Sequence, residues 1–475
     1  MNKDQILALM PIIILSVTAI VLMLQASVKR NPSVAWVITG TGMLAALWGA
    51  GYARGLVQQV TPLIIVDDWG LMFSVLILIA GMVTLILSRD SFSREGERKE
   101  EYYLLLTLSV LGAVVLIQSS HLATLLLGME LMGVALYAMI AFPEKGLLSL
   151  EAAIKYLVLS ACASAMLLFG FALLYAATGD LSYAGIGAKA ALAYQQNPAL
   201  VMAGAALVIA GLGFKLSIVP FHMWTPDVYE GSPTPITGFL ATVSKGAIFV
   251  AVTRIFVDGN LAQFDNLLAA LTVVAIASML MGNLLALRQD NIKRLLAYSS
   301  IAHFGYLLIV LIAASNTDIP ISDAITFYLV AYIVTTLAAF TVVTTIAGED
   351  ESSYGLAAFE GLFWTKPIQA SALTVAMLSL AGIPLTAGFV GKFYVITTGI
   401  QASLWTLIIA LIVGSAIAIY YYLRVIFAMS KFVKVGETRD TGHLIIHDVL
   451  AFVLLALVLV LGSWPQPFIE LIGSL

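Results

Sequence analysis

The sequence predicts an all-α polytopic membrane protein with about 14 transmembrane helices. Of its 475 residues, 61% are hydrophobic and only 11% are charged, whereas soluble domains carry about 25% charged residues. The mean hydropathy of +1.01 is also far above the globular range. Apolar stretches of about 20 residues, the length a helix needs to cross a bilayer, recur along the whole chain. No linker or low-complexity tract separates off a soluble module.

The predicted spans follow one another with short connections. In order they are 5–28, 33–53, 71–88, 102–118, 121–140, 152–177, 198–219, 233–255, 264–286, 292–314, 320–346, 367–393, 399–424 and 447–467. The first segment is longer than the apolar core of a signal peptide and no small-residue cleavage site follows it, so we interpret it as a span.

Positive charges predict the orientation of the chain. If the N-terminus faces outward, the inward loops hold fifteen of the 23 lysines and arginines and the outward side holds three, while five fall inside spans. Lysine and arginine are enriched in the cytoplasmic loops of membrane proteins. Because an even number of spans returns the chain to its starting side, we expect both termini on the outer side.

Two predicted spans combine a proline with a lysine. The seventh contains Lys215 and ends near Pro220, and the twelfth contains Pro384 and Lys392. Proline removes a backbone donor and clashes with the preceding turn, so we expect both helices to be discontinuous. Interrupted helices at matching positions indicate two inverted five-helix repeats of the transporter type. We expect one membrane domain over 1–475, with spans 1–3 at 5–88, repeats at about 102–255 and 264–424, and span 14 at about 447–467.

Glu130 stands out in the fifth span, HLATLLLGMELMGVALYAMIAF. It lies nine residues beyond His121, which places it about 13 Å deep, close to the midplane of the bilayer. A charge at that depth costs about 2.5 to 3.5 kcal/mol on insertion scales. A structural carboxylate paired with a lysine is the alternative, but ionisable residues within a membrane usually mark an ion or proton path.

Three lysines also suggest an ion or proton path. Lys245 lies ten residues beyond Pro235, about 15 Å into the eighth span. Lys215 and Lys392 lie beside the two expected helix breaks. Irregular backbone at membrane depth is tolerated only beside protein or a water-filled cavity, so these amines can exchange protons with water. We predict that they belong to a proton relay.

Four other residues are weaker candidates. Lys155 lies about one turn inside the sixth span, where a lysine that snorkels to the inner surface explains it equally well. His222 lies beside the first helix break and is a fair relay candidate, whereas a structural hydrogen bond explains His303 equally well. Arg254 closes the eighth span and fits a snorkelling anchor better than a functional residue.

Other kinds of chemistry find little support. The single cysteine, Cys162, excludes a disulfide framework and an all-cysteine cluster within the chain. No phosphate-binding loop exists, and GIGAKA follows no strand, so it is a chance match to a dinucleotide fingerprint. His443 and His447 have no evident third ligand, which argues against a metal site. A net charge of -4 gives no reason to expect a nucleic-acid partner.

Five stretches together resemble a known family. They are SLEAAIKYLVLSA, GLGFKLSIVPFHMWTPDVYEGSPTP, NIKRLLAYSSIAHFGYLL, LSLAGIPLTAGFVGKFYV and the closing GSWPQP. The chain resembles the antiporter-like membrane subunits of respiratory complex I, the bacterial NADH-quinone oxidoreductase. The resemblance extends over nearly the whole chain, and its second and fourth stretches are very specific.

The resemblance implies which residues form the proton channel. The family's charged positions in helices five, six, seven, eight and twelve fall on Glu130, Lys155, Lys215, Lys245 and Lys392. The helix-twelve residue is lysine in one subunit of the family and glutamate in a sister subunit. With the two histidines, the expected relay set is Glu130, Lys155, Lys215, His222, Lys245, His303 and Lys392.

The resemblance also implies an activity and partners. The chain would be a subunit of NADH:quinone oxidoreductase, a translocase, that carries no redox site and no metal of its own. NADH, FMN, iron–sulfur clusters and quinone would be bound by other subunits. Its expected partners are the antiporter-like subunit M, the small membrane subunits K, J and A, and the lipid of a bacterial inner membrane, with both chain termini periplasmic.

Two other interpretations stay open at this stage. Cation/proton antiporters of the stand-alone or multi-subunit type share this helix plan, and only the five stretches above favour complex I. A structural scaffold that moves no proton is the second alternative. Scaffolding, however, does not explain why a midplane glutamate and several lysines occur within the helices of one chain.

Overall fold

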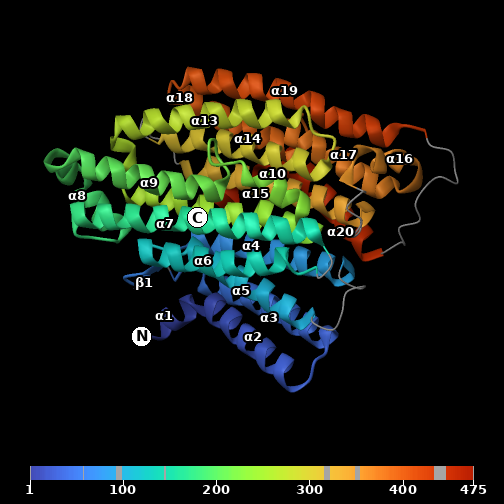
Figure 1. Cartoon of the computed structure of the whole chain (residues 1–475), viewed down its shortest axis with the longest axis horizontal. Coiled ribbons are helices and arrows are strands. Elements are labelled where there is room, and N and C mark those ends of the chain that lie inside the picture. The colour runs from blue at the N-terminus through green and yellow to red at the C-terminus, as the bar shows by residue number, and fades with distance from the viewer. Residues whose placement is uncertain are drawn as a thin grey trace. The chain divides into compact units, whose positions relative to one another are not determined.

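The computed structural model of the chain describes residues 2–56, 58–91, 99–143, 146–314, 321–347, 354–432 and 445–473 (Figure 1). Within these ranges the regular structure is helical apart from one small hairpin. Thirteen of the described helices are long and apolar enough to cross a membrane. The predicted all-α, multi-pass class is therefore confirmed.

The long helices match the predicted spans closely. They are α2 (Met10–Val28), α3 (Pro32–Ala53), α4 (Asp68–Ser91), α5 (Lys99–Ile117), α6 (Leu122–Ile140), α7 (Leu147–Thr178), α9 (Pro198–Leu216), α11 with α12 (Thr234–Phe239 and Lys245–Asp258), α13 (Asp265–Ala286), α14 (Ile292–Ala313), α15 (Ile321–Ala347), α19 (Trp405–Ser430) and α20 (Ile445–Ser463). The predicted twelfth span is instead two short helices, α17 (Pro367–Ala381) and α18 (Ala387–Gln401).

Smaller elements lie between the long helices and near the two ends of the chain. They are α1 (Lys3–Ala8), β1 (Gln58–Thr61), β2 (Ile64–Val66), α8 (Tyr183–Gln196), α10 (Trp224–Gly231), α16 (Leu362–Thr365) and α21 (Gln466–Gly473). The two strands pair antiparallel, with Gln59 opposite Ile65. Such short segments lack the long apolar signal that identifies a span.

Polar caps fix where several helices begin. The side chains of Asn31, Ser182 and Asn291 accept hydrogen bonds from backbone amides in the first turns of α3, α8 and α14. His121 does the same for α6, where its Nδ1 atom accepts from the Ala123 amide at 3.1 Å. These caps satisfy amides that have no partner inside the helix.

The helix is interrupted at both prolines. α9 ends at Leu216 and α10 begins at Trp224, so the residues around Pro220 are not helical. Likewise, residues 382–386 around Pro384 separate α17 from α18. Each interruption contains a non-glycine residue with positive φ, Ser217 at 63° and Leu385 at 72°, a conformation that L-residues rarely adopt. The relation of the two segments as inverted repeats stays a prediction.

A third irregularity was not predicted from the sequence. Leu240–Ser244 forms a π-helical segment, η1, between α11 and α12. Such segments are rare and occur frequently at functional sites. Lys245 follows it directly as the first residue of α12.

The chain divides into two compact units. Unit 1 comprises Met1–Leu216 and Val243–Gln263, and unit 2 comprises Ser217–Thr242 and Phe264–Leu475. The chain passes from unit 1 to unit 2 at the break after α9, returns to unit 1 inside η1 and enters unit 2 again after Gln263. Within unit 1, α5 packs along α6 and α7 along α9, and within unit 2, α13 packs along α14 (Figure 1). Also within unit 2, α15 packs along α18.

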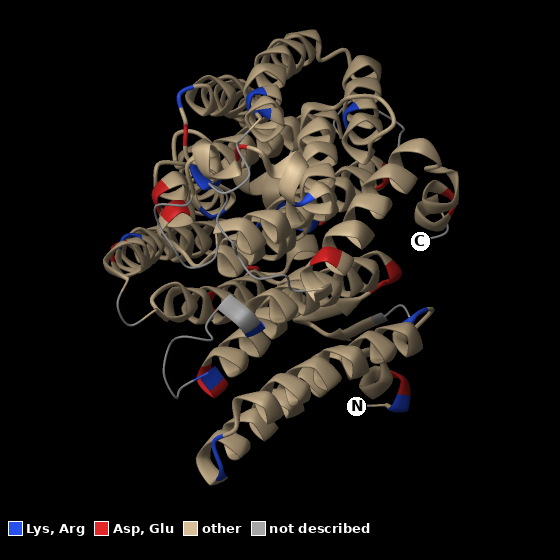
Figure 2. Ribbon diagram, turned by 90° about the vertical axis from the view of Figure 1, so that its right-hand side faces the viewer, with Lys and Arg blue, Asp and Glu red and all other residues tan. Residues whose placement is uncertain are grey.

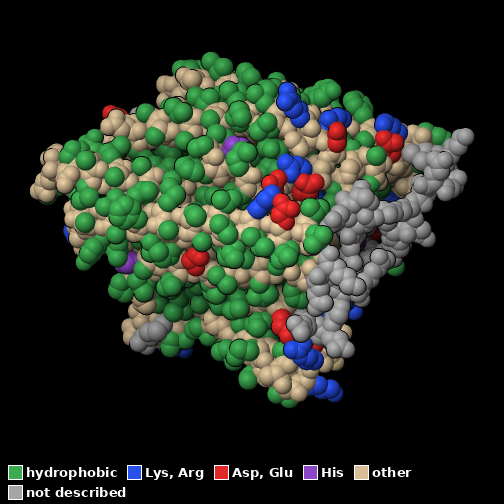
Figure 3. All heavy atoms as spheres, in the orientation of Figure 1, with side chains coloured by type: hydrophobic (Ala, Val, Ile, Leu, Met, Phe, Trp, Pro, Cys, Tyr) green, Lys and Arg blue, Asp and Glu red, His purple; other side chains and the backbone are tan. Residues whose placement is uncertain are grey.

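Apolar side chains cover much of the surface. α2 and α3 carry no charged residue along their lengths, and Figure 2 shows other long stretches of helix without charge. On the face drawn in Figure 3, hydrophobic side chains predominate and charged ones gather in small groups. Exposed apolar residues such as Trp48 (62%) and Phe427 (64%) suit contact with lipid or other membrane helices.

Two glycines allow α5 and α6 to approach closely. A Cβ atom on Gly128 would lie 2.8 Å from the Leu116 amide nitrogen, and one on Gly112 would lie 2.6 Å from the Met132 nitrogen. Because both neighbours are backbone atoms, they cannot move aside as a flexible side chain would. Small residues at such contacts are typical of membrane helix pairs.

Gly128→Ala is therefore expected to destabilise the protein by about 1 to 3 kcal/mol, the usual cost of overpacking. The measurement is thermal unfolding of the protein purified in detergent. Gly51→Ala is the matched control, since it also lies in a helix but a Cβ atom there has no neighbour within 4 Å. Equal stability of the two variants would contradict the close packing of α5 on α6.

Candidate functional site

Glu130 and Lys215 lie together inside unit 1. Glu130 projects from the middle of α6 and Lys215 from the last turn of α9, and the carboxylate Oε1 is 3.9 Å from the ammonium Nζ. The Lys215 side chain is only 2% exposed, whereas that of Glu130 is 35% exposed within this chain. The structure thus brings together two of the charged residues expected in the relay.

Hydroxyl groups surround this ion pair. Lys215 Nζ donates to Ser160 Oγ at 2.6 Å and lies 3.5 Å from the Tyr137 hydroxyl. Ser164 Oγ donates to Glu130 Oε1 at 2.5 Å. The sequence did not single out Ser160 and Ser164, because serine is common in apolar helices. A signal was present: Ser160 and Ser164 are four residues apart, so they share one face of α7.

Lys245 is also in unit 1 and is completely buried, with 0% of its surface exposed. It occupies the first position of α12, directly after η1. The altered hydrogen-bonding pattern of a π-helical turn displaces the following residue relative to a regular helix. The irregular backbone and the buried amine therefore occur at the same point of the chain.

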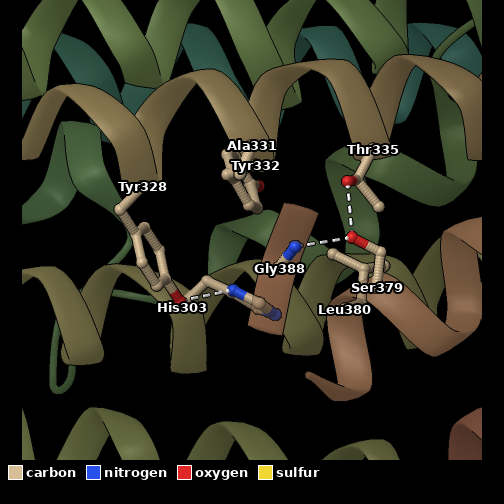
Figure 4. Close-up of a pocket in the computed structure, with 8 residues that line it drawn as sticks. All are labelled: His303, Tyr328, Ala331, Tyr332, Thr335, Ser379, Leu380 and Gly388. Atoms are coloured by element: carbon tan, nitrogen blue, oxygen red, sulfur yellow. Dashed lines mark hydrogen bonds between the residues drawn. The ribbon is translucent and has the colours of Figure 1, made fainter. Parts of the chain in front are cut away.

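His303 lies in unit 2, in the middle of α14, and is buried. Its Nδ1 atom is 2.7 Å from the Tyr328 hydroxyl and its Nε2 atom is 3.4 Å from the Tyr422 hydroxyl. Figure 4 shows the Tyr328 hydroxyl directed at the imidazole, while Ser379 bridges the Thr335 hydroxyl and the Gly388 amide.

A small cavity adjoins His303. It has a volume of about 10 Å³, roughly the space of one water molecule. Its lining consists of His303, Tyr328, Ala331, Tyr332, Thr335, Ser379, Leu380 and Gly388 (Figure 4). The imidazole thus has hydroxyl neighbours and lies beside a small cavity.

Lys392, also in unit 2, binds the end of the broken helix. Its Nζ donates to the Ala381 carbonyl at 2.9 Å and to Ser415 Oγ at 3.2 Å, and lies 5.3 Å from the centre of the Tyr306 ring. Ala381 is the last residue of α17, where carbonyls lack helical partners and the helix dipole favours a cation. The break near Pro384 therefore creates the binding position for the amine.

Lys155 and His222 complete the predicted relay set. Lys155 pairs with Glu151 one turn earlier on α7, at 2.7 Å, and the two side chains are 41% and 58% exposed. His222 is buried in the turn between α9 and α10. Asp227, which follows it closely in sequence, pairs with Arg294 at 2.8 Å. Lys155 thus has an acidic partner on its own helix and is partly exposed.

The interpretation of Arg254 as a snorkelling anchor is wrong. Its side chain is 6% exposed and both terminal nitrogens bind the Asp67 carboxylate, at 2.8 and 2.6 Å, while Nε donates to the Ile117 carbonyl at 2.7 Å. Burial raises the pKa of Asp67, but hydrogen bonding and attraction from the Arg254 guanidinium outweigh burial, so this pKa lies below its ordinary value of 3.8. The partner, 187 residues away, could not be identified from sequence.

Of the two C-terminal histidines, the structure describes only His447. His443 lies outside the described residues, and His447 is buried with its Nδ1 atom 3.3 Å from the Thr345 hydroxyl. Over the part of the chain that the structure describes, no group of three histidine, cysteine or acidic side chains could hold a metal ion.

Comparison with known sequences gives consistent matches. Residues 119–418 match the family described as NADH:quinone oxidoreductase/Mrp antiporter, transmembrane. NADH-quinone oxidoreductase subunit N of Methylococcus capsulatus is 45% identical over 473 residues, which are 99% of this chain and 95% of the relative.

Solved structures agree. A chain of respiratory complex I from Thermus thermophilus is 34% identical, covers 97% of this chain and 99% of its own, and has a TM-score of 0.83. A chain of the archaeal membrane-bound sulfane sulfur reductase is 25% identical, with coverages of 99% and 96% and a TM-score of 0.86. A chain of the Mrp complex from Dietzia sp., 22% identical with coverages of 100% and 97% and a TM-score of 0.83, shares the fold.

The fold and the buried charges define a multi-pass membrane protein that holds ionisable groups inside its helix bundles. The matches are specific enough to assign the family. The chain belongs to the NADH:quinone oxidoreductase/Mrp antiporter transmembrane family, the antiporter-like membrane subunits. The resemblance inferred from sequence motifs is thereby confirmed.

Asp67→Asn is expected to destabilise the protein by about 3 kcal/mol at neutral pH, because it removes the carboxylate charge that binds both terminal nitrogens of the buried Arg254 guanidinium. Thermal unfolding in detergent measures the effect. A carboxyl group whose pKa is lower in the folded than in the unfolded protein stabilises the fold at pH values above the unfolded pKa. That stabilisation is lost as the pH falls through the folded pKa. The difference in unfolding free energy between wild type and Asp67→Asn should therefore become smaller below about pH 4.

Glu101→Gln provides the control for this experiment. Glu101 pairs with Arg30 at 2.8 Å, but the two side chains are 39% and 51% exposed. An exposed pair contributes about 0 to 1 kcal/mol. If the two variants lost the same stability at neutral pH, burial would not be what makes the Asp67–Arg254 pair important.

Proposed function

We propose that the chain is a proton-translocating membrane subunit of NADH-quinone oxidoreductase, in the position of subunit N. The observation that carries the proposal is the 45% identity to a subunit N over 99% of this chain, combined with amines buried inside both units. In this role the chain belongs to an enzyme, a translocase, but performs no redox step itself. Electron transfer elsewhere in the complex supplies the energy.

Unit 1 holds the part of the relay that controls proton affinity. A carboxylate beside an ammonium stabilises the charged amine, and separating the two makes release of the proton easier. The Glu130–Lys215 pair can therefore take up a proton at Lys215 Nζ when closed and release it when open. Lys245, fully enclosed in the same unit, is the next amine that can carry the proton.

Unit 2 holds the other part of the relay. The His303 imidazole can accept a proton on one nitrogen and donate from the other, and it has the Tyr328 and Tyr422 hydroxyls as neighbours. Lys392 Nζ is the terminal carrier of this set. His222 belongs to the proposed relay through its position beside the first helix break, and Lys155 through the resemblance of its sequence motif. Lys155 has the weaker structural support because its side chain is 41% exposed.

The proposed direction of proton transport, the membrane and the neighbouring subunits are those that the resemblance to the family implies. Protons enter from the cytoplasm, are held in turn by the two sets of residues and leave to the periplasm, with both chain termini periplasmic in a bacterial inner membrane. NADH, FMN, iron–sulfur clusters and quinone are bound by other subunits. The neighbours are the antiporter-like subunit M and the small membrane subunits K, J and A.

A cation/proton antiporter of the multi-subunit type is the second candidate. The family description includes Mrp antiporters, and a chain of the Mrp complex shares the fold. The difference in identity, 45% to a subunit N against 22% to the Mrp chain, favours NADH-quinone oxidoreductase.

Lys245→Ala and Lys392→Ala, each in the assembled complex, are expected to lower the number of protons moved per electron, although neither residue touches an electron carrier. The Lys→Arg variants should also impair transport, because arginine does not release its proton. The measurement is proton uptake into vesicles together with NADH oxidation.

Lys189→Ala is the matched control. Lys189 is a surface residue, 48% exposed and paired with Asp180 at 3.1 Å, so its loss should leave the proton-to-electron ratio unchanged. If both buried-lysine variants assembled and kept the wild-type ratio, the scaffold interpretation would replace the proposed relay.

A further inference from the structure

The Glu130–Lys215 pair is not in direct hydrogen-bonding contact. Its 3.9 Å separation exceeds the 2.7–2.9 Å typical of a charge-assisted hydrogen bond. Each charged group instead has a closer hydroxyl partner: Ser160 lies 2.6 Å from the ammonium and Ser164 lies 2.5 Å from the carboxylate. Two serines on one face of α7 thus contact the two ions separately.

The Tyr137 hydroxyl is a second neutral neighbour of the Lys215 amine. Tyr137 projects from α6 seven residues beyond Glu130, two turns along the same face, and its hydroxyl donates to Ser160 Oγ at 2.5 Å. Ser160 is 0% exposed and Tyr137 9% exposed. Lys215 therefore has a carboxylate on one side and a buried pair of neutral hydroxyls on the other.

A glycine leaves room for the amine between these two positions. Gly133 lies on α6 between Glu130 and Tyr137, and a Cβ atom there would be 3.1 Å from the Tyr137 hydroxyl and 3.6 Å from Lys215 Nζ. A larger residue would crowd the space beside the ammonium. The small residue and the hydroxyls together allow the amine to change partners without entering an apolar environment.

We propose that Ser160, with Tyr137, is a positioning group that forms a second binding position for the Lys215 amine. The inference rests on the proposed relay and specifies how its ion pair opens. An ammonium that left Glu130 inside a water-excluded bundle would otherwise lose its hydrogen bonds, which is costly for a buried charge. Ser160 receives the amine as the pair separates, so the pair can open on each turnover.

The test measures proton uptake coupled to NADH oxidation in the assembled complex carrying Ser160→Ala. Loss of one hydrogen bond to a charged group predicts about a tenfold decrease in coupled proton transport. Ser160→Thr restores the hydroxyl and should recover most of it. The pH profile of transport should move in Ser160→Ala and return in Ser160→Thr, which a purely structural role would not produce.

Two further variants keep the proposal testable. Gly133→Ala retains both hydroxyls but fills the space beside the amine, so it should also impair transport, even if Ser160→Ala fails to assemble. Ser149→Ala is the control, since Ser149 is a buried serine at the start of the same helix, α7. It should leave transport unchanged.

The outcomes separate this inference from the proposed function. If Ser160→Ala and Gly133→Ala both transport protons like Ser149→Ala, while Glu130→Gln abolishes transport, the second position of the amine does not exist and the relay stands. If Glu130→Gln also transports protons normally, the ion pair has no role and the proposed function itself fails.

Discussion

The structure depends on one constraint: a charged amine inside an apolar helix bundle must keep a polar partner. Lys215 contacts a carboxylate and hydroxyls. Lys392 donates to the Ala381 carbonyl at the C-terminal end of α17 and to Ser415. Transferring either ion to hydrocarbon without such partners would cost far more than packing recovers. The hydrogen-bond partners of Lys392 are both neutral, so in the proposed relay this amine can hold or release a proton while it keeps them.

The helix irregularities follow from the same constraint. A regular helix satisfies its own carbonyls and has none to offer a cation, whereas a helix end does. The break between α17 and α18 frees the Ala381 carbonyl for Lys392. The break after α9 follows Lys215 directly, and the π-helical segment directly precedes Lys245. Three interruptions therefore accompany three buried amines, and the chain passes between its two compact units at two of them.

Hydropathy predicted most of the fold because lipid forces backbone groups into helices about 20 residues long. The spans followed from that rule, and the two breaks followed from proline, which cannot continue a regular helix. Glu130 and Lys215 were expected in the relay from the cost of burying charge and from the resemblance to the family. The features that the sequence did not predict mostly depend on contacts between segments that are distant in the chain. The Asp67 partner of Arg254, the hydroxyls of Ser160 and Tyr137, and the π-helical segment have no local signature. The β1–β2 hairpin and α8 are too short for an apolar signal.

The central claim is that the Lys215 amine carries protons rather than only stabilising the bundle. The most direct measurement is the proton-to-electron ratio of the complex reconstituted in vesicles, compared between wild type and Lys215→Ala. The account predicts that the variant complex assembles and that its ratio falls, because the site next to Glu130 can no longer hold a proton. An assembled Lys215→Ala complex with the wild-type ratio would contradict it.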